Sequence, residues 1–219
     1  MIDLRRTAPV ELPIALWRVH RRTAVGDQIA VRLPGGVDGH AVLEGAGFSS
    51  DGVRQRTLAD CVGPGMRLLV CGLNPSLYSA DAGTGFARPG NRFWPAVLAA
   101  GLATVARDPL ALLEDEGIGM TDLVKRATVA AAELTVPEYA HGVERVERLC
   151  AWLAPGAVAV VGFDGWRKAV DRRAVAGWQT RSLGGRPVYL MPNPSGLNAH
   201  TNVATLAAHL DAAVAGPAR

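Results

Sequence analysis

The chain contains two apolar runs that each lead into the tripeptide Asn-Pro-Ser. The first run covers residues 67–73, with its tripeptide at 74–76, and the second covers 187–192, with its tripeptide at 193–195. Short apolar runs that are rich in branched residues and bounded by Pro and Gly are typical of buried strands. Ligands of open α/β sheets bind outside the carboxyl ends of the strands. We therefore expect the two turns to meet at one site, although they lie far apart in the chain.

Strand-like and helix-like segments alternate downstream of residue 58. Residues 157–163 form a third apolar run of the strand type. Helices are expected near residues 93–100, 109–116, 137–153, 165–175 and 202–213. Such alternation predicts an α/β protein with a three-layer α/β/α architecture around a central, mostly parallel sheet.

Residues 1–57 differ in pattern from the rest and predict a small N-terminal α/β extension of unknown role, followed by one domain over residues 58–219. The expected elements of the extension are helices at 13–22 and 40–45 and strands at 28–33 and 53–57. The arginine pairs Arg5-Arg6 and Arg21-Arg22 are either contacts to DNA or ordinary solvated surface.

Composition restricts the function only a little. With 219 residues, 49% of them hydrophobic, the chain can bury one good core plus an appendage. The net charge of +3 suits a polyanionic partner but also fits many other soluble proteins. No apolar segment approaches membrane-spanning length, and the N-terminus lacks a signal-peptide pattern. We expect a cytoplasmic protein with no membrane partner.

The cysteines argue against metal and disulfide chemistry. Cys61, Cys71 and Cys150 are isolated, and none has a second cysteine or a histidine at zinc-binding spacing. Three cysteines also cannot supply the four ligands of an iron–sulfur cluster. We expect three buried thiols that behave as small hydrophobic groups, no metal site and no cofactor.

Four blocks carry a specific resemblance. They are Gly-Leu-Asn-Pro-Ser at 72–76, Pro-Gly-Asn-Arg-Phe-Trp at 89–94, Gly-Ile-Gly-Met-Thr-Asp-Leu-Val at 117–124 and Asn-Pro-Ser-Gly-Leu-Asn at 193–198. In this order and spacing the chain resembles, over residues 58–212, the mismatch-specific uracil-DNA and thymine-DNA glycosylase family of the uracil-DNA glycosylase superfamily.

The resemblance implies hydrolysis of an N-glycosidic bond, in which positive charge develops on the sugar and negative charge on the leaving base. It assigns to Asn74 the orientation of the attacking water. The alternative is that Asn74 only stabilises a turn, since Asn-Pro favours turns by itself.

Asp122 departs from the family pattern, which does not usually place a carboxylate at this position. A carboxylate here could polarise the water or stabilise the developing oxocarbenium ion. The alternative is that Asp122 caps the amino end of a helix. Asp81 is a weaker catalytic candidate that fits an exposed loop equally well.

The resemblance also implies a base-binding pocket and a wedge that enters the duplex. It places Phe86 against the flipped base, unless this ring belongs to the core, and makes Asn91 and Trp94 scaffold. Lesser pocket candidates are Ser76, Leu77, Ser79 and Thr121. The expected wedge comprises Asn193, Ser195, Gly196, Leu197, Asn198 and His200, with Leu197 as the plug. The family often has an arginine after the wedge; this chain has Ala199-His200, and His200 is either a substitute or an ordinary surface histidine.

The resemblance implies a monomeric, monofunctional DNA glycosylase that removes uracil, chiefly opposite guanine, from double-stranded DNA with a damaged or mismatched base. It would be nucleoid-associated when acting on DNA. No lysine falls in the four blocks, so a Schiff-base lyase step is not expected. Two alternatives remain open: a module that flips lesions without cleaving them, and a glycosylase for bulkier bases such as ethenocytosine or hypoxanthine.

Overall fold

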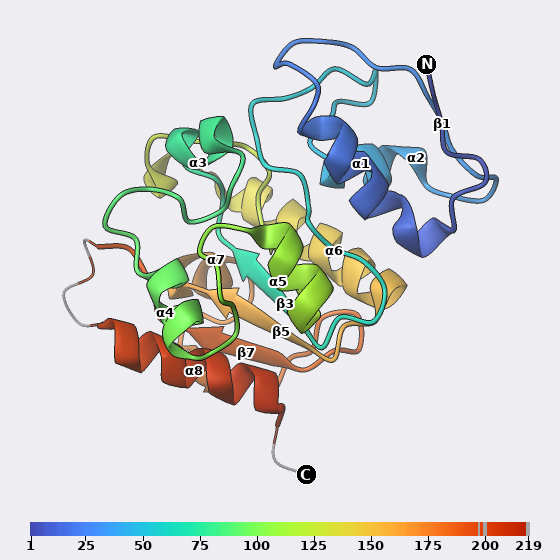
Figure 1. Cartoon of the computed structure of the whole chain (residues 1–219). Helices are drawn as coiled ribbons and strands as arrows, with labels where there is room; N and C mark the ends of the chain where they lie inside the picture. The colour runs from blue at the N-terminus through green and yellow to red at the C-terminus, as the bar shows by residue number, and fades with distance from the viewer. Residues whose placement is uncertain (197, 199–200, 218–219) are drawn as a thin grey trace.

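The computed structural model describes residues 1–196, 198 and 201–217, and a five-stranded sheet forms its centre (Figure 1). The strands are β3 (Leu68–Gly72), β4 (Ile118–Asp122), β5 (Ala157–Val161), β6 (Gly177–Trp178) and β7 (Val188–Met191). Their order is β4-β3-β5-β7-β6, and all neighbours are parallel except β6, which pairs with β7 in the antiparallel sense. The carboxyl ends of four strands therefore lie along one edge of the sheet.

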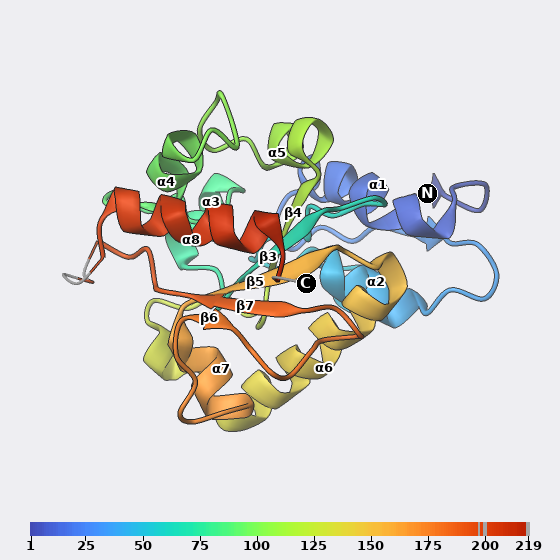
Figure 2. The ribbon, with the colours of Figure 1, turned by 90° about the horizontal axis from the view of Figure 1, so that it is seen from below.

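Helices cover both faces of this sheet (Figure 2). One face carries α4 (Phe93–Ala99), α5 (Pro109–Glu116) and α8 (Val203–Ala215), and the other carries α6 (Val136–Leu153) and α7 (Phe163–Ala169). A short helix, α3 (Leu77–Ala82), follows β3, and a 3-10 turn, η2 (Ala131–Glu133), precedes α6. The predicted three-layer α/β/α architecture is confirmed.

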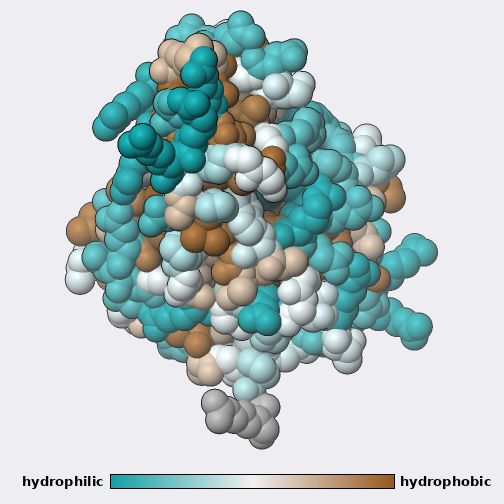
Figure 3. Space-filling model, turned by 90° about the vertical axis from the view of Figure 1, so that its right-hand side faces the viewer, coloured by the Kyte–Doolittle hydropathy of each residue, from teal (hydrophilic) through white to brown (hydrophobic). Residues whose placement is uncertain are grey.

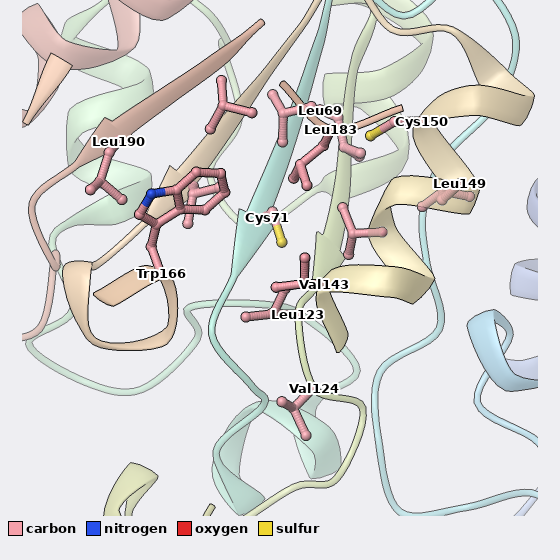
Figure 4. Close-up of a cluster of buried hydrophobic side chains, with 14 of the residues drawn as sticks. Leu69, Cys71, Leu123, Val124, Val143, Leu149, Cys150, Trp166, Leu183 and Leu190 are labelled. Carbon is pink, nitrogen blue, oxygen red and sulfur yellow. The ribbon is translucent and has the colours of Figure 1, made fainter. Parts of the chain in front are cut away.

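The side chains of β3 point alternately to the two faces of the sheet and contribute to the hydrophobic core on each face. Leu68 and Val70 belong to the cluster under α4 and α8, whereas Leu69 and Cys71 belong to the cluster under α6 and α7 (Figure 4). Successive residues of a strand point to opposite faces, so a strand that is covered on both sides must be apolar at every position. This is why residues 68–71 are apolar at every position rather than alternating.

Several elements differ from the expected ones. Strand β4 was not predicted, because Gly119 at its second position and the polar residues at its end weaken the strand pattern. A Cβ at Gly119 would collide with the sulfur of Met66, so the packing here favours glycine. Helix α7 ends at Ala169 instead of continuing to residue 175. The expected strand at 53–57 is reduced to isolated bridges between Gln28 and Val53 and between Phe48 and Arg54.

The N-terminal extension packs around a small core of its own. Its elements are β1 (Ile2–Asp3), the 3-10 turn η1 (Pro9–Glu11), α1 (Leu12–His20), β2 (Val31–Arg32) and α2 (Gly39–Gly45), with β1 and β2 paired in parallel. Leu12, Leu16 and Phe48 are buried in this core, and Trp152 of α6 packs against both it and the main core. Seen from this side, the surface is mostly hydrophilic, with apolar side chains in small separate areas (Figure 3).

The three cysteines are buried and free, as expected from the sequence. Burial raises the pKa of the Cys61 and Cys150 thiols to about 12, so both remain uncharged at neutral pH. In the described part of the chain, no three His, Cys, Asp or Glu side chains converge as a metal site would require. None of the described helices is long and apolar enough to cross a membrane.

Candidate active site

A cavity of about 330 Å³ opens where the four parallel strands end. Each strand contributes to its lining: Asp122 ends β4, Asn74 follows β3, Val161 ends β5 and Asn193 follows β7. The two Asn-Pro turns therefore meet at one site, as their positions after apolar runs predict.

Asn74 is held in one orientation by its amino group. Its Nδ2 donates hydrogen bonds to the main-chain oxygen of Arg126 (3.0 Å), to Oγ1 of Thr128 (2.8 Å) and to the main-chain oxygen of Pro75 (3.2 Å). Two carbonyl acceptors fix which end of the amide is the nitrogen. Among the described residues, none donates a hydrogen bond to the Asn74 carboxamide oxygen. This oxygen is therefore available to accept a hydrogen bond from a water molecule in the cavity.

Asp122 is a buried carboxylate in the same cavity. It is 9% exposed, and no donor within the described ranges reaches its carboxyl oxygens. Burial raises the pKa of Asp122 to about 6; the positive charge of Lys125 opposes this rise, Asp60 adds to it and Arg145 opposes it. Carboxylates with raised pKa values in clefts are typical of catalytic groups. The helix-cap alternative is wrong, because Asp122 is the last residue of β4 and no helix begins there.

A buried ion cluster lies behind β4. Asp60 accepts hydrogen bonds from Arg145 of α6 (2.7 Å), from Lys125 (2.8 Å) and from the Thr121 hydroxyl (2.6 Å). Arg145 also donates to the main-chain oxygen of Asp122. Burial would raise the pKa of Asp60, but the charges of Arg145 and Lys125 outweigh it and keep this pKa below its usual value. The cluster thus fixes the end of β4 and places two cations behind Asp122.

Phe86 forms one wall of the cavity. Its ring stacks on that of Phe93, with centroids 4.1 Å apart and planes inclined by 24°. The Phe86 backbone has a φ of 58°, which is uncommon for a residue other than glycine and turns the chain sharply before α4. The ring is half-buried and so contributes both to the core and to the cavity wall.

Polar groups complete the lining. Ser76 caps α3 by accepting a hydrogen bond from the Ser79 amide (3.1 Å), and both serines face the cavity. Asn91 also lines the cavity, and its Oδ1 accepts from the Phe93 amide (2.9 Å), as expected for a residue that stabilises the turn. Trp94 is buried and donates from Nε1 to the Gly85 oxygen (2.9 Å), in agreement with a scaffold role.

Three expected site residues lie elsewhere. The Leu77 amide donates to the Thr128 oxygen (3.2 Å), so it is unavailable to a ligand, and Leu77 does not line the cavity. Thr121 points to the opposite face of β4 from Asp122, into the ion cluster with Asp60, because successive strand residues alternate. Asp81 forms an exposed ion pair with Arg56, outside the cavity.

Arg92 holds the loop after β7 in place through hydrogen bonds. This loop contains the expected wedge. The Arg92 guanidinium donates to the main-chain oxygens of Asn198 (2.8 Å), Thr201 (2.5 Å) and Gly196 (3.4 Å). Asn193 stabilises the same loop by accepting from the Ser195 amide (2.9 Å). Leu197 and His200 lie outside the described residues. Arg92 was not singled out in the sequence, although it belongs to the Asn-Arg-Phe-Trp block; its role becomes visible only when the two distant segments are brought together.

The three-layer α/β/α fold, with a cavity at the strand ends where the two Asn-Pro turns meet, agrees with the family that the four sequence blocks resemble. The chain belongs to the uracil DNA glycosylase superfamily, whose family model matches residues 60–214. Members of this superfamily are hydrolases that act on DNA. The fold is also similar to the solution NMR structure of a candidate uracil DNA glycosylase from Methanosarcina acetivorans. That match has a TM-score of 0.50 and 19% identity, and covers 71% of this chain and 98% of the other.

Proposed function

We propose that this protein is a monofunctional glycosylase that removes uracil, chiefly opposite guanine, and related damaged pyrimidines from duplex DNA. One observation carries the proposal: the cavity places the unengaged carboxamide oxygen of Asn74 together with the buried carboxylate of Asp122. Neither the Asn74 carboxamide oxygen nor the Asp122 carboxylate accepts a hydrogen bond from another described residue. Both suit a reaction that needs a positioned water and a negative charge near an electron-deficient sugar.

The proposed reaction divides the work between the two residues. The base leaves as an anion when the bond from C1′ to the base nitrogen breaks, and positive charge then develops on the sugar ring. The Asp122 carboxylate stabilises this charge, and the Asn74 oxygen orients a water for attack on C1′. The water loses its proton to Asp122 or to solvent, and an abasic site remains. Lys125 is held by Asp60 and does not line the cavity, which agrees with hydrolysis rather than Schiff-base formation.

Base binding requires extrusion of the nucleotide, because the bond is inaccessible inside the duplex. Phe86 offers a ring for stacking, and such contacts contribute about 1–3 kcal/mol per base. Asn91 and Ser79 line the same cavity and can contact the polar edge of a pyrimidine. Because stacking on an aromatic ring tolerates several bases, we assign the discrimination between uracil and other bases to the polar groups of Asn91 and Ser79.

The test is a single-turnover cleavage assay in the presence of EDTA. The substrates are duplexes with uracil opposite guanine, uracil opposite adenine and thymine opposite guanine, together with single-stranded uracil. We expect the highest rate for uracil opposite guanine. Binding without cleavage of any of the four would favour a lesion-binding module instead. Cleavage of ethenocytosine or hypoxanthine, tested in the same format, at rates above that for uracil would favour a glycosylase of bulkier bases.

A further inference from the structure

A hollow lined by four arginines lies where the extension meets the segment before α5. Arg18 lies in the last turn of α1, Arg21 and Arg22 directly follow this helix, and Arg107 lies in the loop before α5. The two acidic groups nearby are engaged, since Glu114 pairs with Arg18 (3.1 Å) and Asp108 caps α5 through the amides of Leu110 and Ala111. In the described part of the chain, the side chains of Arg22 and Arg107 have no acidic partner. This leaves a concentration of positive charge that an anionic ligand would relieve.

The hollow is held in shape by specific contacts. Arg21 donates from Nη1 to the Gly83 oxygen (3.1 Å), and its guanidinium lies 5.0 Å from the centroid of the Trp17 ring. Arg107 has a φ of 63°, a left-handed conformation that is unfavourable for a residue other than glycine. Residues in this conformation cluster at ligand-binding sites, which agrees with a binding role for this loop.

The hollow is close to the base cavity. Trp17 lines the hollow and also a small space whose lining includes Phe86 and Asp122 of the base cavity. Gly83, whose main-chain oxygen accepts the hydrogen bond from Arg21, is the C-terminal cap of α3. The N-terminal cap of the same helix, Ser76, lines the base cavity. The six residues of α3 span about 9 Å at 1.5 Å per residue. The end of α3 that Arg21 contacts therefore lies about three phosphate steps, at 3.4 Å of axis per phosphate, from the cap that lines the base cavity.

We propose that Arg22 and Arg107 bind backbone phosphates of the DNA beside the extruded nucleotide, so that the N-terminal extension forms part of the DNA-binding surface. The inference rests on the proposed function, which makes DNA the ligand. Arginines suit phosphate oxygens because the guanidinium presents several donors in one plane. Arg5 is not included, since its guanidinium is already paired with the Asp3 carboxylate through hydrogen bonds of 3.0, 3.3 and 2.7 Å.

The test compares two double variants that lose the same charge. Arg22→Ala/Arg107→Ala removes the proposed phosphate ligands, and Arg172→Ala/Arg173→Ala removes two exposed arginines that follow α7, in the layer on the opposite face of the sheet from α5. Affinity for an undamaged duplex is measured by fluorescence anisotropy between 50 and 200 mM salt. A plot of the logarithm of the association constant against the logarithm of the salt concentration has a negative slope. The magnitude of this slope decreases by about 0.9 for each phosphate that the protein no longer neutralises. For Arg22→Ala/Arg107→Ala we expect the magnitude of the slope to decrease by about 1.8, and the affinity at the lowest salt to be weaker by about tenfold or more. For Arg172→Ala/Arg173→Ala we expect neither change.

Two outcomes would overturn the inference. One is an unchanged slope and affinity in Arg22→Ala/Arg107→Ala, and the other is an equal decrease in the Arg172→Ala/Arg173→Ala control. Circular dichroism and the single-turnover rate at saturating enzyme verify that each variant is folded. Because binding to undamaged DNA is measured separately from cleavage, a protein that fails to remove uracil would refute the proposed function without deciding whether the arginines bind phosphate.

Discussion

The carboxylate of Asp122 lies over the backbone of Gly72, in the space that a side chain at position 72 would occupy. The two residues are paired across β3 and β4, and a Cβ on Gly72 would collide with Oδ1 of Asp122. The same position is 3.3 Å from Cζ of Phe86, so the carboxylate and the ring share the space above this glycine. Glycine at position 72 is therefore what allows the carboxylate and the aromatic wall to lie together.

Gly72→Ala should abolish this arrangement. The added methyl group must displace the Asp122 carboxylate, the Phe86 ring or both, and overpacking of a core typically costs about 1–3 kcal/mol. We expect a loss of cleavage of about 10²-fold or more with a moderate decrease in stability. Gly63→Ala is the matched control, because a Cβ there would meet its nearest neighbour, Leu113, at an ordinary 3.8 Å. Wild-type activity in Gly72→Ala would contradict the assignment of Asp122 to the site.

Asp122→Asn should stabilise the protein at neutral pH. The pKa of Asp122 is about 6 in the folded chain, against 3.8 as its ordinary value. The folded state therefore holds the proton more tightly, and ionising Asp122 above pH 6 lowers the free energy of unfolding by about 3 kcal/mol. This penalty diminishes as the pH falls through 6 and is absent below about 3.8, where both states are protonated. Chemical denaturation at pH 7.5 and pH 4 should show a gain for the variant at pH 7.5 that largely disappears at pH 4.

The cleavage rate of the wild type should increase as the pH rises through 6, whereas the contribution of Asp122 to stability decreases over the same range. If the carboxylate form of Asp122 acts, the single-turnover rate of the wild type should fall about tenfold per pH unit below pH 6. Asp122→Asn should be slower by about 10²–10⁴ and should lack this acidic limb. Lys125→Met removes a positive charge that lowers the pKa of Asp122, so it should move the limb to higher pH. If the rate of Asp122→Asn fell at the same acidic pH as that of the wild type, the loss of activity at low pH would belong to a group other than Asp122.

Asn74→Ala and Asp122→Ala should not have additive effects on the rate. Each alone should slow cleavage by far more than it weakens DNA binding, because both groups act on the same reacting centre. The double variant should then be little slower than the slower single variant. Fully additive losses would indicate that the two residues act in separate steps. Asn74→Ala should also lower stability, since it removes the hydrogen bonds to Arg126 and Thr128.

Arg92→Ala should affect duplex substrates more than single strands. Arg92 holds three main-chain oxygens of the loop after β7, and the duplex alone needs a wedge to fill the gap left by the flipped base. Leu197→Ala should show the same preference if Leu197 is the plug. Equal losses on duplex and single-stranded uracil for both variants would remove the wedge assignment.

The sequence by itself determined the layered fold and the meeting of the two Asn-Pro turns. Continuous apolar runs require burial on both faces, and parallel strands bring their carboxyl ends to one edge. It could not predict β4, because a five-residue strand with one glycine and two polar residues has a weak pattern. Nor could it separate Thr121 from Asp122, because adjacent strand residues differ only in the face of the sheet toward which they point.

Only the tertiary structure decided what each polar side chain contacts. It placed the cations of Arg145 and Lys125 behind Asp122, left the oxygen of Asn74 unengaged among the described residues, and brought Arg92 to the loop after β7. It also distinguished Arg5, which is paired with Asp3, from Arg22, which lies in the hollow near the base cavity. Hydrogen bonds and ion pairs between distant segments depend on packing in three dimensions, and no spacing along the chain encodes them.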